Sequence, residues 1–240
     1  MGLPTGQELL GVTMRTPGNA EEHAAGFLLS EGIVRTRTDL REITRCTLPA
    51  SLGNVLNIAL AATAKFTPAA VHRFGTISTS CGLCGKTSIE FIRQQFPPIN
   101  GATPIRIDAA KLLELPGRLR SAQGNFARTG GIHAAGIFDL AGNLVAVRED
   151  IGRHNAVDKL VGWALIQDAA VAASTALDAA VAASTALGDA VLVVSGRLGY
   201  EIVQKAIAAG IPIVASVGAA SSLAVELAER FGLTLATFLR

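Results

Sequence analysis

The sequence has few aromatic residues, few charged residues and few cysteines for its 240 positions. Aromatic side chains make up 5% of the chain, which disfavours nucleic-acid binding by base stacking. The formal net charge is +2, too small for non-specific binding to DNA or to an anionic membrane. A charged fraction of 17% beside 50% hydrophobic residues excludes a disordered chain, a collagen and a coiled coil. We therefore expect one large or two small globular domains, with neither nucleic acid nor membrane as a partner.

Signals for export and for membrane insertion are also missing from the pattern. Residues 1–8 lack a basic segment followed by a long apolar core, so we expect no signal peptide. The uncharged stretch Ala206–Val225 has the length of a membrane span, but Gly210, Pro212 and Gly218 interrupt it. A helix end, a short strand and a new helix explain this stretch better. These observations predict a cytoplasmic protein.

The first part of the chain mixes helices and strands. Its predicted helices and strands are Ala20–Glu31, Arg41–Leu48, Asn54–Ala61 and Thr87–Gln95. Asn19 is the expected N-cap of the first helix. Two prolines, Pro97 and Pro98, end the last helix, and the turn signal Asn100-Gly101 follows them. We place a domain boundary there, which makes residues 1–104 a smaller N-terminal α+β subdomain.

The second part, residues 105–240, alternates helices and strands. The predicted helices are Ala109–Leu115, Leu119–Phe126, His154–Leu165, Leu198–Ala209 and Ser221–Phe231. The predicted strands are His133–Asp139, Leu144–Arg148, Ala190–Ser195, Ile213–Val217 and Leu233–Phe238. The third of these strands contains four consecutive aliphatic residues and is expected to be buried on both faces. This alternation favours an α/β fold with a partly parallel sheet.

A tandem duplication interrupts the second part. Residues Asp168–Leu177 are repeated without change at Asp178–Leu187. Two copies of ten residues are too short for a solenoid. We interpret them as a peripheral lengthening of an alanine-rich helix or surface loop.

The sharpest chemical motif is the C-x-x-C formed by Cys81 and Cys84 in the loop Cys81–Gly85. Glycines beside both cysteines let a reactant approach the backbone closely. The N-terminus of the expected helix and the cation of Lys86 both favour the thiolate form. A thiolate is the nucleophile that accepts sulfur from a persulfide or exchanges disulfides.

From spacing alone, three interpretations of this motif stay open: reactive thiols, a metal site and a structural loop. Three cysteines, an odd number, do not form a disulfide framework. A structural zinc site needs four ligands, and a second C-x-x-C is missing. The other candidate ligands are Cys46, His72, His133 and His154, and no spacing recommends them.

Polar residues gather where predicted strands meet helices. Eight of the twelve residues in Arg148–Lys159 are polar or charged, and Val194–Glu201 places Ser-Gly-Arg before a helix. Ligands bind at strand ends in α/β sheets, and helix N-termini with an arginine attract anions. The candidate contacts of a phosphorylated ligand are His133, Arg153, His154, Lys159 and Arg197. The alternative is an ion-paired helix start without a ligand.

His133 is similar to the first ligand of the zinc nucleobase deaminases, whose signature is H-x-E followed by P-C-x-x-C. Position 135 is alanine where the catalytic glutamate belongs, and the C-x-x-C precedes the histidine. A working hydrolytic deaminase is therefore not expected, whereas a deaminase-like backbone with other chemistry stays open.

Three features in this order resemble the FdhD family, the sulfur carrier proteins for formate dehydrogenase. They are the C-x-x-C loop, the segment Thr129–Ala135 followed by Arg148–Lys159, and the segment Val194–Glu201. Arg15–Gly18 and Gly26–Ile33 also resemble the opening motif of that family, and the resemblance runs from Val12 to Arg240. It implies a cytoplasmic sulfurtransferase that takes persulfide sulfur from a cysteine desulfurase. The acceptor would be the molybdenum (or tungsten) bis(molybdopterin guanine dinucleotide) cofactor, whose sulfuration formate dehydrogenase requires.

The resemblance also implies residue roles and a fold. Cys81 would carry the persulfide and Cys84 would be its partner. The fold would be a layered domain similar to cytidine deaminase, and the protein would form homodimers and bind the guanine-nucleotide part of the cofactor. A cofactor-binding segment of the family begins Phe-x-Arg, which matches Phe238, Leu239 and Arg240. We expect no permanently bound metal; the alternatives are a cofactor chaperone without sulfur chemistry and a degenerate zinc hydrolase.

Overall fold

The computed structural model describes residues 8–48, 53–62, 64, 89, 92–93, 95–99, 105–172 and 187–240. The loop Cys81–Gly85, most of the expected helix Thr87–Gln95 and most of the tandem duplication lie outside these residues. What the sequence predicts for those three segments therefore stays a prediction.

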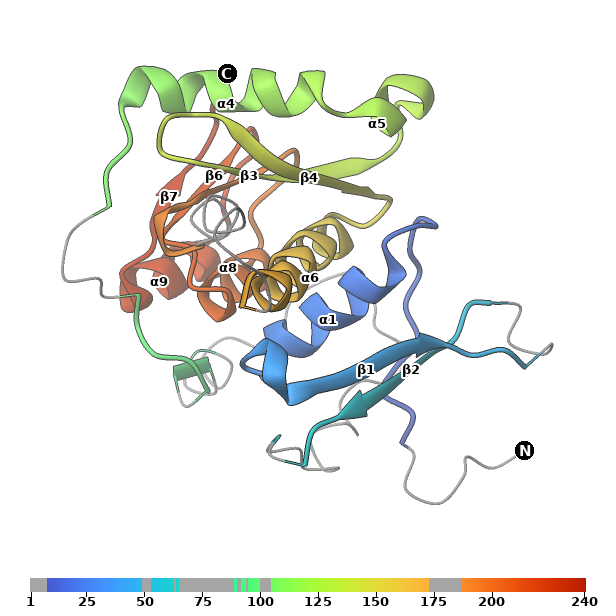
Figure 1. The fold of residues 1–240 in the computed structure, drawn as a ribbon. Coiled ribbons are helices and arrows are strands. Elements are labelled where there is room, and N and C mark those ends of the chain that lie inside the picture. Colours follow the sequence, from blue (N-terminus) through green and yellow to red (C-terminus); the bar gives the residue numbers. More distant parts are fainter. Residues whose placement is uncertain are drawn as a thin grey trace.

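A five-stranded mixed sheet in the order β4-β3-β5-β6-β7 forms the centre of the molecule (Figure 1). Its strands are β3 (His133–Phe138), β4 (Leu144–Asp150), β5 (Val191–Val194), β6 (Ile213–Ser216) and β7 (Thr234–Ala236). Strand β3 is antiparallel to β4 and β5, whereas β5, β6 and β7 are parallel to one another. The three parallel strands thus end at the sheet edge where β3 begins and β4 ends. The predicted α/β fold class is confirmed.

The residues of β5 alternate between the two faces of the sheet. Val191 and Val193 belong to one hydrophobic cluster, and Leu192 and Val194 belong to the other. All four side chains are at most 1% exposed. An unbroken aliphatic run is what a strand covered by helices on both faces requires, so the prediction for this strand is confirmed.

Helices cover both faces of the sheet (Figure 1). One face carries α4 (Ala109–Ser121) and α5 (Gly124–Thr129). The other carries α6 (Arg153–Ala172), α8 (Tyr200–Ala208) and α9 (Ser222–Phe231). Helix α1 (Ala20–Ser30) packs against α6, and the antiparallel hairpin of β1 (Leu40–Arg45) and β2 (Leu56–Leu60) follows it. Short 3-10 helices lie at Arg37–Asp39 and Leu187–Asp189.

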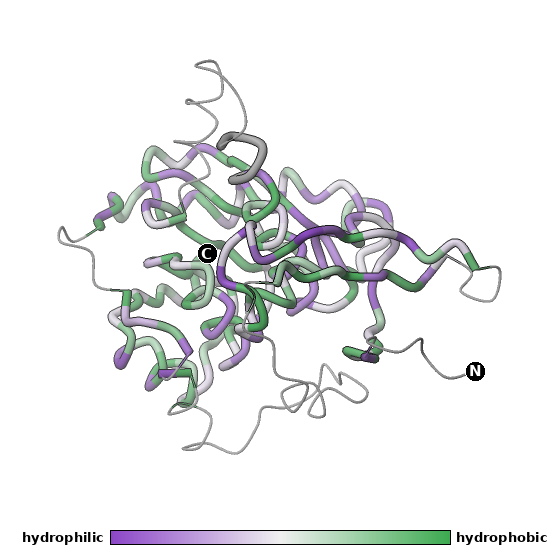
Figure 2. Tube along the Cα trace, turned by 60° about the horizontal axis from the view of Figure 1, so that its bottom comes forward, coloured by the Kyte–Doolittle hydropathy of each residue, from purple (hydrophilic) through white to green (hydrophobic). Residues whose placement is uncertain are grey.

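Hydrophobic and hydrophilic residues are interleaved along these elements (Figure 2). Within the part of the chain that the structure describes, no helix is both long enough and apolar enough to cross a membrane.

The backbones of α1 and α6 touch where the two helices cross. A Cβ added to Gly26 would lie 1.9 Å from the carbonyl oxygen of Asp158, and one added to Gly162 would lie 1.8 Å from that of Glu22. Residues without a Cβ therefore permit this approach. Helix α1 shares its hydrophobic cluster with α6 and α8. The division into residues 1–104 and 105–240 stays a prediction, and packing is continuous between α1 and the second part.

One local prediction is wrong, and another is confirmed in position only. Helix α4 continues through Pro116 to Ser121, where the sequence predicts one helix ending at Leu115 and another over Leu119–Phe126. Leu115 and Leu119, one turn apart, are both buried on the sheet, and this burial outweighs the backbone hydrogen bond that proline lacks. Asn19 does precede α1, but its side chain makes no capping hydrogen bond and its φ is 51°.

Candidate functional site

Three loops lie side by side at the sheet edge where β5, β6 and β7 end. Ser216 Oγ donates to the carbonyl of Gly196, and the N–H of Gly218 donates to Ser216 Oγ at 2.9 Å. The N–H of Phe238 donates to Gly218 O at 3.2 Å, and that of Leu239 donates to Ser216 O at 3.1 Å. Each loop is thereby fixed to the next, at the edge where α/β sheets bind ligands.

The side chains of His133 and Arg153 lie beside Gly196 at this edge, and the backbone of Arg197 lies beside Gly218. A Cβ on Gly196 would lie 3.2 Å from His133 Nδ1 and 3.7 Å from Arg153 Cδ. A Cβ on Gly218 would lie 3.1 Å from the backbone nitrogen of Arg197. Burial, and then the charge of Arg153, lower the pKa of His133, so this imidazole is neutral at pH 7. The structure therefore brings together the side chains of His133 and Arg153, and the exposed Arg197 follows Gly196 in the same loop.

His154 follows Arg153 but is turned into the protein. Its side chain is 9% exposed, and its Nε2 lies 3.2 Å from Glu201 Oε2 on α8. Burial, followed by the charges of Lys205 and Arg153, lowers the pKa of His154 to about 3. Burial raises the pKa of Glu201. His154 thus connects α6 to α8 as a neutral group.

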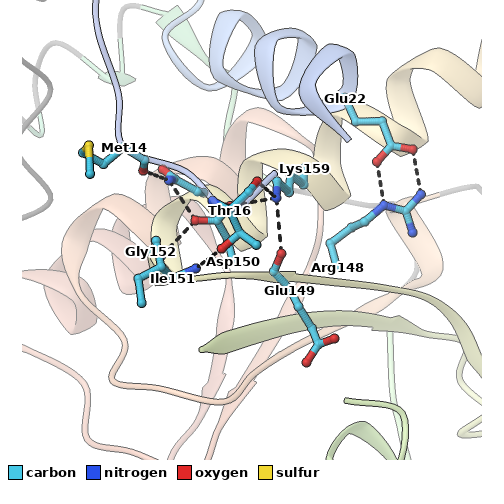
Figure 3. A network of polar contacts seen from close by, with 10 residues as sticks. Met14, Thr16, Glu22, Arg148, Glu149, Asp150, Ile151, Gly152 and Lys159 are labelled. Atoms are coloured by element: carbon cyan, nitrogen blue, oxygen red, sulfur yellow. Dashed lines mark hydrogen bonds and ion pairs between the residues drawn. The ribbon is translucent and has the colours of Figure 1, made fainter. Parts of the chain in front are cut away.

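Lys159 lies in a buried polar network rather than with the two arginines (Figure 3). Its Nζ is 2.7 Å from Asp150 Oδ2 and donates to the carbonyls of Thr16 (2.9 Å) and Glu149 (3.3 Å). Asp150 also accepts hydrogen bonds from Thr16 N, Gly152 N and Asn155 Nδ2. Groups of the protein itself thus accept the hydrogen bonds of the Lys159 ammonium. This corresponds to the alternative interpretation from the sequence, an ion-paired helix start without a ligand.

The acidic residues near this network also serve internal contacts. The carboxylate of Glu149 accepts the N–H groups of Asn125 (2.9 Å) and Phe126 (2.8 Å) and so holds the start of α5. The carboxylate of Asp158 pairs with Lys205 Nζ at 2.8 and 2.9 Å between α6 and α8. The polar run Arg148–Lys159 is therefore largely structural, with Arg153 at its exposed turn as the residue that reaches the strand ends.

A pocket of about 480 Å³ lies beside His133, between α4–α5 and the strand ends. Its lining includes Phe126 and Ser195, and the guanidinium carbon of Arg120 lies 3.8 Å from the centroid of the Phe126 ring. Sequence reasoning missed this pocket because α4 and α5 carry no recognisable motif. The signal that could have found it is the Gly130-Gly131 pair before β3, which lines the pocket.

The remaining predicted residues divide into two groups. Cys81 and Cys84 lie outside the described residues. At the C-terminal end, Leu239 packs against the residues beneath α4, while Phe238 is 59% exposed with a φ of 58° and Arg240 is exposed. The described ranges contain no group of three His, Cys, Asp or Glu residues that can hold a metal ion.

Curated proteins from other organisms are similar to this chain over almost its whole length. Sulfur carrier protein FdhD of Mycobacterium tuberculosis is 46% identical over 238 residues, which cover 95% of this chain and 80% of the relative. The protein of the same name from Streptomyces coelicolor is 45% identical over 236 residues, covering 96% of this chain and 78% of the relative.

A solved structure and a family model agree with these relatives. The crystal structure of a formate dehydrogenase accessory protein from Desulfotalea psychrophila superposes with a TM-score of 0.64 and 26% identity, covering 95% of this chain and 76% of that one. The model of the FdhD/NarQ family matches residues 3–240. The chain belongs to the FdhD/NarQ family.

Proposed function

We propose that this protein is a cytoplasmic, homodimeric sulfur carrier for formate dehydrogenase. It takes sulfur from the persulfide of a cysteine desulfurase and transfers it to the molybdenum bis(molybdopterin guanine dinucleotide) cofactor. The observation that carries the proposal is 46% identity over 95% of the chain to a curated sulfur carrier protein. The C-x-x-C of Cys81 and Cys84 supplies the thiol chemistry that this role needs.

The proposed reaction is a thiol exchange that conserves electrons. The Cys81 thiolate attacks the outer sulfur of the donor persulfide, the donor S–S bond breaks, and the donor cysteine leaves as a thiolate. Cys81 then holds the sulfur as a persulfide. Attack of the Cys84 thiolate on the inner sulfur of Cys81 releases hydrosulfide to the cofactor and leaves a Cys81–Cys84 disulfide, which a cellular dithiol reduces.

The strand-end site supports the second half of this role. Arg153 and Arg197 lie at one sheet edge, and the fork of each guanidinium suits phosphate oxygens. His133 beside them is neutral and able to donate or accept one hydrogen bond. The segment Phe238–Arg240 lies next to Gly218 through the hydrogen bond of Phe238. A dinucleotide cofactor carries the phosphates that such a site attracts.

Mass spectrometry after incubation with a desulfurase and cysteine tests the proposal. We expect one added sulfur atom on Cys81 and none after Cys81→Ala. Cys46→Ser is the matched control, because Cys46 directly follows β1 in the β1–β2 hairpin and lies outside the C-x-x-C motif, and this variant should load sulfur normally.

Activation of formate dehydrogenase separates the proposal from a cofactor chaperone without sulfur chemistry. We expect Cys81→Ala to abolish activation. Full activation by a protein that lacks both Cys81 and Cys84 would overturn the sulfur-carrier role and favour the chaperone.

A further inference from the structure

Helices α6 and α8 are connected by two polar contacts that lie one helical turn apart. Asp158 and Lys205 form the inner contact, with oxygen–Nζ distances of 2.8 and 2.9 Å. His154 and Glu201 form the outer contact, in which Nε2 lies 3.2 Å from Oε2. Each residue of the outer contact precedes its inner counterpart by four positions, so the outer contact lies one turn nearer to both helix starts. Both helices start at the sheet edge where the strand-end loops lie, and the outer contact is therefore the one beside those loops.

The two contacts differ in exposure. The side chains of Asp158 and Lys205 are 4% and 7% exposed, and Ser30 Oγ also donates to Asp158 at 3.0 Å. The side chain of Glu201 is 34% exposed. We therefore expect the inner pair to hold the two helices together and the outer pair to fix only their first turns.

Arg153 begins α6 and lies next to the outer contact. A Cβ on Gly196 would lie 3.7 Å from Arg153 Cδ, so the first two residues of α6 both face the connection from β5 into α8. Within the described part of the chain, Arg153 Nε is buried without a hydrogen-bond partner. The nearby carboxylate of Glu201 pairs with His154 instead. The place of the Arg153 guanidinium thus depends on the backbone at the start of α6.

The outer contact has a defined donor and acceptor. Burial, followed by the charges of Lys205 and Arg153, lowers the pKa of His154 to about 3, so the ring is neutral at pH 7. A neutral imidazole carries one hydrogen, and the carboxylate of Glu201 accepts it from Nε2. Among the described residues, Nδ1 of the same ring has no hydrogen-bond partner. Within that part of the chain, Glu201 is therefore the group that holds the imidazole.

We propose that Glu201 is a positioning residue for Arg153: its hydrogen bond to His154 fixes the first turn of α6 and so places the Arg153 guanidinium at the strand ends. This assignment rests on the proposed function, in which Arg153 contacts a phosphate of the cofactor. A carboxylate repels a phosphate, so Glu201 acts through the histidine and not by contact with the ligand.

Isothermal titration of the whole protein with GDP, which carries the guanosine and two phosphates, tests the assignment. Glu201→Leu removes the acceptor, so we expect the Kd of GDP to rise about tenfold. Glu201→Gln keeps an acceptor oxygen and should stay within about threefold of the wild type. Glu226→Leu, on the exposed side of α9, is the matched control and should leave the Kd unchanged. An unchanged Kd in Glu201→Leu would overturn the assignment.

A double-mutant cycle separates positioning of Arg153 from a general loosening of the fold. Arg153→Ala should weaken GDP binding, and Glu201→Leu should add no further loss in that background, because its effect passes through Arg153. An equal loss in both backgrounds would contradict the assignment. Glu201→Leu should still fold in a urea titration, since the pair of Asp158 and Lys205 is intact. His154→Leu removes the other partner of the outer contact and should give the same rise in Kd and the same cycle.

The same samples distinguish this assignment from the proposed function. Sulfur loading of Cys81 in the wild-type protein tests the carrier role without any nucleotide. Normal loading with an unchanged GDP affinity in Glu201→Leu, or with no GDP binding by the wild type, would contradict the positioning assignment alone. The expected cycle without any loading would contradict the carrier role alone.

Discussion

At the scale of single residues, buried His154 makes stability depend on pH. Burial and neighbouring cations lower its pKa from 6.5 to about 3. Between these pH values His154 is protonated in the unfolded chain and neutral in the folded one. Between those two values, the free energy of unfolding should fall by up to about 1.4 kcal/mol for each unit that the pH drops. The raised pKa of Glu201 opposes this loss near its own titration.

Urea unfolding at pH 7 and pH 5 measures this effect against a variant. His154→Gln removes the titration and keeps much of the volume, so its stability should vary less over this interval than that of the wild type. His23 and His133, whose pKa values are also lowered, remain in both proteins and cancel in the comparison. Identical pH dependence in the two proteins would show that folding does not shift the pKa of His154.

The Asp150–Lys159 pair predicts a large loss when one partner is removed. Both side chains are at most 1% exposed, so an unpaired charge there has no water to solvate it. Lys159→Met should lower the free energy of unfolding by about 3–5 kcal/mol. The double variant Asp150→Asn with Lys159→Met should be more stable than Lys159→Met alone, since no charge is left behind.

An exposed pair supplies the control for this measurement. Arg230 and Glu226 on α9 are 46% and 44% exposed, so Glu226→Gln should change stability by less than about 0.5 kcal/mol. If Lys159→Met were equally harmless, the network of Figure 3 would not hold the N-terminal segment to α6.

At the scale of elements, the α1–α6 crossing has no room for a methyl group. In Gly26→Ala the new Cβ meets the backbone of Asp158, which cannot rotate away, so the helices must separate. We expect a loss of about 1–3 kcal/mol or more in the free energy of unfolding by urea. Gly117→Ala on α4 is the control, because a Cβ there meets nothing within 4 Å. That substitution should leave stability unchanged or raise it by up to about 1 kcal/mol. If Gly26→Ala also kept or raised the stability, helix propensity and not the crossing would decide the outcome.

Elements were easier to predict from the sequence than their contacts. The aliphatic run of β5 and the hairpin of β3 and β4 follow from local pattern, and the structure confirms both. The continuation of α4 through Pro116 depends on burial against the sheet, which no local pattern reveals. Arg153 and Lys159 are both cations in the same polar run, yet Lys159 pairs with Asp150 whereas Arg153 lies at the strand ends. Tertiary packing decides which cation is buried.

At the scale of the whole molecule, the topology explains why residues far apart form one site. His133 starts β3 while Arg197 and Phe238 follow parallel strands, and the mixed sheet places all three at one edge. The sequence predicts ligand contacts at the strand ends, and the structure places Arg153 and Arg197 there. It could not indicate Arg120 and Phe126, since these residues reach the pocket from α4 and α5 on one face of the sheet.

The hydrogen bond between Thr16 and Asp150 has a consequence for synthesis on the ribosome. The two residues are 134 positions apart, so the opening segment emerges long before its partner exists. Helix α1 packs through Gly26 and its apolar side chains against α6, which is translated much later. Until then this apolar side has no partner to cover it. We therefore expect that a pause in translation before α6 leaves this apolar surface open to aggregation and proteolysis.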